Sequence, residues 1–161
     1  MIQVGEQLPD ATLFERDEHG LNRHTLAELT AGQTVALFAV PGAFTPTCSE
    51  KHVPGFIEQA EALRAAGVTQ ILCVAVNDPF VMQRWASSFG AAATPIRFLS
   101  DGNADFTQAL GMARDMSNGA MGLRYKRYAL LATDGVVRWL GVDESGLANA
   151  SAESVLAALR G

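Results

Sequence analysis

One of the two cysteines in this sequence lies where a helix begins, and that position suits nucleophilic chemistry. Cys48 belongs to residues 41–50 (PGAFTPTCSE), which join an apolar segment to a helical pattern. Thr47 begins a Thr-x-x-Glu capping box; alternatively, Thr45 caps the helix and the following proline takes its first position. Either start places Cys48 in the first turn, where unpaired N–H groups and the helix dipole favour the thiolate over the thiol.

A thiolate at a helix start can attack electrophiles, including the O–O bond of a peroxide. The competing interpretation is that Cys48 is a small buried hydrophobe, which is the common fate of a lone cysteine. Thr45 and Pro41 favour the reactive interpretation, because Pro41 can shield one side of a pocket. Pro54 lacks an N–H inside the predicted helix, so we expect a kink near Glu50.

Two other thiol chemistries fit the sequence less well. His52 lies four residues after Cys48 and could form a Cys–His pair of the kind that cysteine hydrolases use, but no third orienting group is visible. A thiol–disulfide oxidoreductase would need a Cys-x-x-Cys pair, and position 45 is Thr. The second cysteine, Cys73, lies in an apolar run typical of a buried strand, where a thiol is normally inert.

The elements that must position these residues alternate between strand and helix along the chain. A turn signal at residues 17–20 divides short apolar runs near the start. Strands are predicted at 34–40, 71–76 and 96–99, helices at 53–63, 78–89 and 104–110, a loop at 111–123, a hairpin at 125–141 with its turn at 133–135, and a last helix at 151–160. Asp78 and Ser151 are the predicted N-caps of the helices that start there. This order predicts a mixed central β-sheet flanked by helices in an α/β, thioredoxin-like fold. A flavodoxin-like sheet is the alternative, and the terminal hairpin fits it poorly.

The composition limits the classes of partner. The chain has 161 residues without a linker, so we expect one domain over 1–161. The net charge of −5 and the lack of a Lys/Arg cluster argue against nucleic acid and anionic membranes. No spacing of ligands indicates a metal site. The N-terminal residues show neither a signal peptide nor an apolar span, which predicts a cytoplasmic location.

The pattern Pro41-x-x-x-Thr45-x-x-Cys48 resembles the active-site signature of the peroxiredoxins. The longer string over residues 41–56 is similar to the type II, or peroxiredoxin-5, subfamily, and residues 76–82 and 126–128 agree with it as well. The resemblance covers essentially the whole chain. It implies a thioredoxin-like fold, no bound cofactor, no metal, and a thiol peroxidase that reduces hydrogen peroxide and alkyl hydroperoxides.

The resemblance also implies the role of each site residue. Cys48 matches the peroxidatic thiolate, which becomes a sulfenic acid. Thr45 matches the hydroxyl that bonds the thiolate and the peroxide, and Pro41 covers the site. Arg127 matches the guanidinium that supports the thiolate and the charge that develops across the O–O bond. From the residues alone, Arg127 could not be preferred over the other arginines near it in the sequence.

The sequence says less about how the sulfenic acid on Cys48 is reduced back to the thiol. Some subfamily members have a cysteine at the position of Cys73, which is therefore a possible resolving thiol. However, a residue in the middle of a strand and one at a helix start are expected to lie too far apart for a disulfide. Other members use a cysteine in the loop before the last helix, and residues 143–150 have none. We therefore predict that an external thiol acts, most plausibly glutathione with glutaredoxin, with thioredoxin as the other reductant.

Two further expectations concern assembly and turnover. Family members often dimerise through the active-site end of the sheet, so we predict a homodimer that buries Phe44, Phe80 and Trp85, with core positions as the alternative. The rival function is a thioredoxin-like redox-sensor or binding module, in which oxidation of Cys48 signals without useful turnover.

Overall fold

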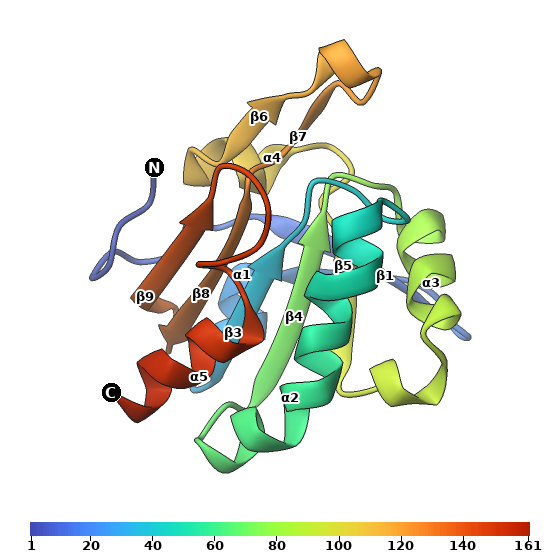
Figure 1. Cartoon of the computed structure of the whole chain (residues 1–161). Coiled ribbons are helices and arrows are strands. Elements are labelled where there is room, and N and C mark those ends of the chain that lie inside the picture. Colours follow the sequence, from blue (N-terminus) through green and yellow to red (C-terminus); the bar gives the residue numbers. More distant parts are fainter.

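A mixed sheet with the strand order β2-β1-β5-β4-β3-β8-β9 organises the computed structural model, which describes all 161 residues (Figure 1). β3, β4 and β5 are parallel, whereas β8 and β9 are antiparallel to their neighbours. The strands are β1 Thr12–Asp17, β2 Gly20–Thr25, β3 Thr34–Ala39, β4 Gln70–Ala75, β5 Ile96–Ser100, β8 Arg127–Thr133 and β9 Val136–Asp143. This arrangement confirms the predicted mixed sheet, and the antiparallel pairs exclude the flavodoxin-like alternative.

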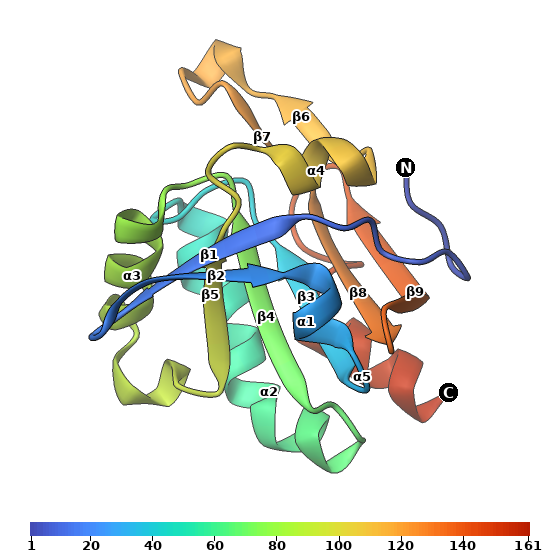
Figure 2. The ribbon, with the colours of Figure 1, turned by 180° about the vertical axis from the view of Figure 1, so that it is seen from behind.

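Helices cover both faces of the sheet. One face carries α2 Val53–Ala65, α3 Pro79–Ser88 and α5 Ala152–Arg160 (Figure 1). The other face carries α1 Leu26–Thr30 and α4 Asp105–Leu110 (Figure 2). The β1–β2 hairpin also crosses this face, because β1 joins the sheet through the Phe14–Ser100 pair with β5 and otherwise diverges from it. None of the helices is both long enough and apolar enough to span a bilayer.

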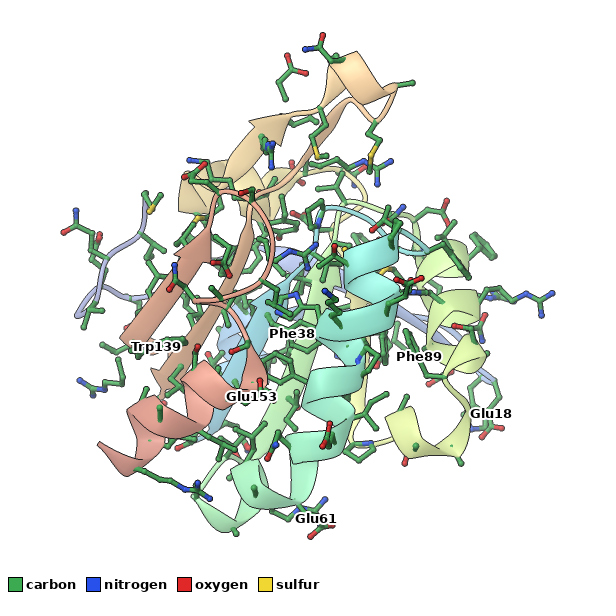
Figure 3. All side chains as sticks on the ribbon, viewed as in Figure 1. Glu18, Phe38, Glu61, Phe89, Trp139 and Glu153 are labelled. Carbon is green, nitrogen blue, oxygen red and sulfur yellow. The ribbon has the colours of Figure 1, made fainter.

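The alternation of side chains along the central strands creates two hydrophobic cores. In β3, Phe38 belongs to the core under α2, whereas Leu37 belongs to the core on the opposite face. Phe38 is labelled in Figure 3, where it lies in the interior of the molecule, and its ring stacks on Phe56 of α2 at a centroid distance of 4.0 Å. Both faces of a parallel strand are covered, which explains why the sequence of β3 is apolar throughout.

Two N-cap residues mark the starts of α3 and α5. Asp78 accepts a hydrogen bond from the Val81 N–H at 2.9 Å, and Ser151 accepts one from the Ser154 N–H at 3.1 Å. Both predicted N-caps are thereby confirmed, because each side-chain oxygen satisfies a donor that the helix itself leaves free.

The prediction of a plain loop at residues 111–123 was wrong. β6 Ala113–Asp115 and β7 Leu123–Tyr125 pair antiparallel, and the 3₁₀ turn Ser117–Gly119 lies at their tip. The ribbon projects beyond the sheet at the end where α2 starts (Figure 1). Strands of three residues are too short to show an alternating pattern, so no strand period can be detected in this segment.

Candidate active site

The helix that bears Cys48 begins at Pro46, whose fixed φ suits the first helical position. Its first intrahelical bond is donated by the Ser49 N–H to the Thr45 carbonyl at 2.9 Å. Thr47 already has helical dihedrals and makes no capping bond, so the capping-box alternative was wrong. Cys48 therefore lies in the first turn, ahead of the first internal hydrogen bond, where N–H groups lack helical acceptors.

The irregularity expected near Glu50 takes the form of a π-helical turn over Cys48–His52. The Val53 N–H reaches back five residues to the Cys48 carbonyl. Pro54 has no N–H to offer to the carbonyl four residues earlier, and a wider turn accommodates that loss. Cys48 and His52 are both buried on the inner side of this turn.

Arg127 is the charged group that reaches Cys48. Its Nη2 donates to the Cys48 Sγ at 3.1 Å, and only 7% of Arg127 is exposed. Arg127 opens β8 on the same face as Ala129 and Leu131, which belong to the core under α2. Because a guanidinium is always charged, this bond brings a fixed positive charge to the buried sulfur.

His52 contacts Arg127 and not the thiol. Its Nδ1 lies 2.7 Å from the Arg127 Nη1, and its Nε2 lies 2.7 Å from the Ala150 carbonyl oxygen. A hydrolase-type Cys–His pair is therefore absent. Desolvation by burial, followed by the nearby charge of Arg127, lowers the pKa of His52 from 6.5 to about 3. His52 is consequently a neutral acceptor for the guanidinium at physiological pH.

The segment that precedes Cys48 is held from both sides. The Ala43 N–H donates to the Asn77 Oδ1 at 2.9 Å, and the Arg124 Nη1 donates to the Pro41 carbonyl at 3.4 Å. A Cβ at Gly42 would lie 3.0 Å from that Arg124 nitrogen, so any larger residue would push against the arginine side chain. Pro41 is buried beside it. Asn77 and Arg124 were not identified as functional from the sequence.

Thr45 is partly buried at the helix start, and its hydroxyl has a defined direction. The hydroxyl donates to the Gly42 carbonyl at 2.6 Å and makes no hydrogen bond with Cys48. The hydroxyl hydrogen is therefore already used in the bond to Gly42, and the hydroxyl oxygen still has lone pairs that can accept a hydrogen bond.

Cys73 lies in β4 and belongs to the same hydrophobic core as Cys48, and both are free thiols. Complete burial raises the pKa of Cys73 well above its ordinary value, and a charge on Cys48 adds to that effect. The predicted burial of Cys73 is confirmed, and this thiol is protonated at neutral pH.

The three aromatic residues assigned to a dimer interface do not share one environment. Trp85 is fully buried, and its Nε1 donates to the Ser49 Oγ at 3.0 Å. Phe44 is 57% exposed and Phe80 61% exposed. Trp85 is therefore a core residue that fixes α3 against the start of the Cys48 helix, and its placement at an interface was wrong.

Comparison with known proteins agrees with this geometry. The Redoxin family profile matches residues 3–156. The chain is 55% identical to peroxiredoxin-2E-2, chloroplastic, of Oryza sativa subsp. japonica, over 98% of this chain and 72% of that protein. It is 48% identical to peroxiredoxin-2E, chloroplastic, of Arabidopsis thaliana, over 98% of this chain and 69% of that protein. The chain belongs to the peroxiredoxin family.

Solved structures give the same result. Reduced Prx3 of Vibrio vulnificus in complex with hydrogen peroxide superimposes on this peroxiredoxin with a TM-score of 0.94, at 48% identity and with 99% of each chain covered. Peroxiredoxin 5 of Alvinella pompejana gives a TM-score of 0.87 at 30% identity, again over 99% of each chain. These relatives establish the thioredoxin-like peroxiredoxin fold and a type II, peroxiredoxin-5-like membership.

These relatives test two expectations drawn from the sequence, the enzymatic activity and the cellular location. The protein is a thiol peroxidase, which the peroxiredoxin relatives support over the redox-sensor alternative. The predicted cytoplasmic location is contradicted, because the two relatives named above are chloroplastic proteins. That expectation relied on the absence of a targeting pattern, and an absence of this kind does not identify a compartment.

Proposed function

We propose that Cys48 is the peroxidatic thiolate of this enzyme and that it reduces hydrogen peroxide and alkyl hydroperoxides. The observation that supports this assignment is the buried hydrogen bond of 3.1 Å from the Arg127 guanidinium to the Cys48 sulfur. The thiolate attacks the terminal peroxide oxygen, so an S–O bond forms while the O–O bond breaks. The product is a sulfenic acid, and the departing hydroxide or alkoxide takes a proton from solvent to become water or an alcohol.

Arg127 and Thr45 have different roles around the reacting oxygen atoms: one donates hydrogen bonds and the other accepts one. Arg127 offers N–H donors where negative charge develops, as expected of a preorganised electrostatic site. Thr45 has already donated its hydroxyl hydrogen to Gly42, so its oxygen accepts the O–H hydrogen of the peroxide. Pro41 covers the site and limits the access of water. Because Cys48 is fully buried, the peroxide must displace some of the surrounding atoms to reach the sulfur.

An external thiol regenerates Cys48 in this proposal. Cys73 is the only other thiol, it is completely buried, and its raised pKa leaves it protonated and a poor nucleophile. Glutathione with glutaredoxin, or thioredoxin, supplies a thiol that attacks the sulfenic acid, releases water and leaves a mixed disulfide. A second thiolate then attacks that disulfide, which returns Cys48 as a thiolate and oxidises the reductant.

A homodimer that covers Phe44 and Phe80 accompanies this function. Both aromatic rings are largely exposed, and Phe44 also holds a left-handed φ of 65°, a conformation that costs about 1 kcal/mol or more in a residue with a Cβ. Phe44 lies four residues before Cys48, and Phe80 lies in the first turn of α3. Covering these rings in a second copy removes apolar surface from water beside the site.

Peroxide consumption with separately supplied reductants tests the function. We expect Cys48→Ser to remain folded and to lose at least about 10²-fold in activity, because serine is nearly isosteric but is not a thiolate. Cys73→Ser is the matched control and should keep most of the turnover. Residual activity near the wild-type level in Cys48→Ser would exclude Cys48 as the attacking group.

A further inference from the structure

Two arginines lie directly opposite each other in the β6–β7 ribbon, and the peroxide chemistry described above uses neither of them. Arg114 of β6 pairs with Arg124 of β7 in the antiparallel register. Residues paired in this way share one face of the ribbon, with Cβ atoms about 5 Å apart. Like charges in this arrangement repel each other and destabilise the pair. An anion bound between them would relieve that repulsion.

Neither arginine has an acidic side chain as its partner. The three ion pairs of the structure involve neither of them. The carboxylate of Asp115, which follows Arg114 in β6, accepts hydrogen bonds from the backbone N–H and the hydroxyl of Ser117. Glu144 gives Arg114 only its backbone carbonyl, at 3.3 Å. These two carboxylates lower the local positive potential, but they leave both guanidiniums without an ion pair.

Arg124 reaches the segment that precedes Cys48. Its Nη1 donates to the Pro41 carbonyl at 3.4 Å. A Cβ placed on Gly42 would lie 3.0 Å from that nitrogen and 3.3 Å from the Thr45 Cγ2. Arg124 therefore lies beside the threonine that is assigned to the peroxide.

Arg114 reaches a second loop that borders the site. The Glu144 carbonyl that it bonds belongs to the loop between β9 and α5. That loop also presents the Ala150 carbonyl to His52, which contacts Arg127. β3 and β9 are each antiparallel to β8, so the segment before Cys48 and this loop leave the sheet at the same edge, where the ribbon projects (Figure 1). The two arginines therefore carry positive charge to two segments around the active site.

Most of the N–H donors of the two arginines are free. A guanidinium has five donors in a planar fork that matches a carboxylate. Arg124 uses its Nε for the Met121 carbonyl at 2.8 Å and its Nη1 for Pro41. Arg114 is exposed and uses only its Nη1. The Nη2 of each arginine donates to no atom of the chain, so a carboxylate can bind there without displacing the existing bonds.

The reactant that suits this pair is a small thiol that carries carboxylates. The proposed regeneration step needs an external thiol at Cys48, and glutathione has one carboxylate on each side of its thiol-bearing residue. We propose that Arg114 and Arg124 bind the carboxylates of glutathione and bring its sulfur to the sulfenic acid on Cys48. The S–S bond forms as the S–O bond breaks, and the hydroxyl leaves as water with the proton of the thiol. This inference deepens the proposed function and rests on it.

Glutathione and its diethyl ester, compared in the same variants, test the proposal. The ester presents the same thiol without either carboxylate. The full chain in a Cys73→Ser background is first oxidised with one equivalent of hydrogen peroxide, and the sulfenic acid on Cys48 is measured by mass spectrometry. Each thiol is then added, and the rate constant for formation of the mixed disulfide is measured. The variants are Arg114→Gln, Arg114→Glu and Arg124→Gln.

Arg138→Glu is the matched control, because it changes the net charge as Arg114→Glu does. Arg138 is exposed on β9, about 17 Å along the strand from Asp143, which pairs with Arg127. This control separates local binding from the general attraction between an anionic thiol and the protein. It should keep the rate constants of the wild type to within about twofold, because a charge at that distance is largely screened by salt.

We expect Arg114→Gln to lower the rate constant for glutathione by about fivefold, the scale of one exposed charged contact. Arg114→Glu should lower it by about tenfold or more, because repulsion replaces attraction, and added salt should reduce the difference. Both variants should react with the diethyl ester as the wild type does. Arg124→Gln also loosens the Pro41 segment, so its readout is the ratio of the two thiols, which should fall by about fivefold.

Three results would overturn the proposal. One is a wild-type rate constant for glutathione in Arg114→Glu. The second is an equal loss with glutathione and with its ester, since a loss that ignores the carboxylates reflects a disturbed site. The third is a loss in Arg114→Glu confined to the oxidation step with linoleic acid hydroperoxide and absent with its methyl ester, which would assign the pair to the peroxide. The sulfenic acid is measured before any thiol is added, so a failure of the peroxidase function appears at that earlier stage and is distinguished from a failure of this proposal.

Discussion

Burial of a neutral histidine should make the stability of this peroxiredoxin fall in mild acid. The pKa of His52 is about 3 in the folded chain, against 6.5 for an unperturbed histidine. The unfolded state therefore binds the proton first as the pH falls, so the free energy of unfolding decreases from about pH 6.5 down to about pH 3. At about pH 4.5 the difference of two pH units corresponds to roughly 3 kcal/mol, at 1.36 kcal/mol for each unit.

Urea unfolding at about pH 7 and about pH 4.5 measures this loss in the wild type and in His52→Asn, which cannot titrate. The difference between the two proteins isolates His52 from the carboxylates that titrate over the same range. Burial raises the pKa of Asp101, so its contribution has the opposite sign, but it is common to both proteins and cancels. His19→Asn is the matched control, because His19 is exposed at the β1–β2 turn.

We expect the wild type and His19→Asn to lose roughly 3 kcal/mol more than His52→Asn on acidification. A loss of a similar size in all three proteins would show that His52 is protonated in the folded chain. That outcome would refute the neutral tautomer, and with it the hydrogen bond that Nδ1 accepts from Arg127. The test is independent of catalysis, so it checks the geometry of the site without assuming its chemistry.

The remaining predictions concern the reaction and the assembly. Arg127→Gln and Thr45→Val should each slow the peroxide step on the order of 10²-fold, the scale for one charge-stabilising group; an unchanged thiolate titration in Arg127→Gln would disprove its electrostatic role. Mass spectrometry after one equivalent of peroxide should find Cys48 as a sulfenic acid or a glutathione adduct, whereas a stoichiometric Cys48–Cys73 disulfide would restore a two-cysteine cycle. Sedimentation at micromolar concentration should show a dimer that Phe44→Asp weakens, and a wild-type monomer would contradict the interface.

The parts of the fold that could be predicted are those whose signals are local. Apolar runs with both faces covered, the Asp78 and Ser151 caps and the turn at residues 133–135 all depend on neighbours within a few positions. The ribbon of β6 and β7 depends on pairing between short segments without a period, and the assignment of Trp85 to the core depends on its distant bond with Ser49. Such contacts are not encoded in any local pattern.

The residues of the candidate site show the same difference between local signals and distant contacts. Pro41, Thr45 and Cys48 lie within one short segment, so a motif can identify them together. The role of His52 depends on Arg127 and on the Ala150 carbonyl, both of which are far from it in the sequence. The only hint available was its separation of four residues from Cys48, and that spacing suggested a direct Cys–His contact that the structure does not contain.

Arg127 could be selected only through the family resemblance, and the geometry of β8 explains why. Successive residues of a strand point to opposite faces, so Arg127, Ala129 and Leu131 share one face of β8, and Tyr128 and Leu130 share the other. Both faces of β8 are buried, and parity alone could not tell which of them α2 covers. Only the three-dimensional arrangement brings the Cys48 helix onto the odd-numbered face, and it directs the arginine that opens the strand to the sulfur.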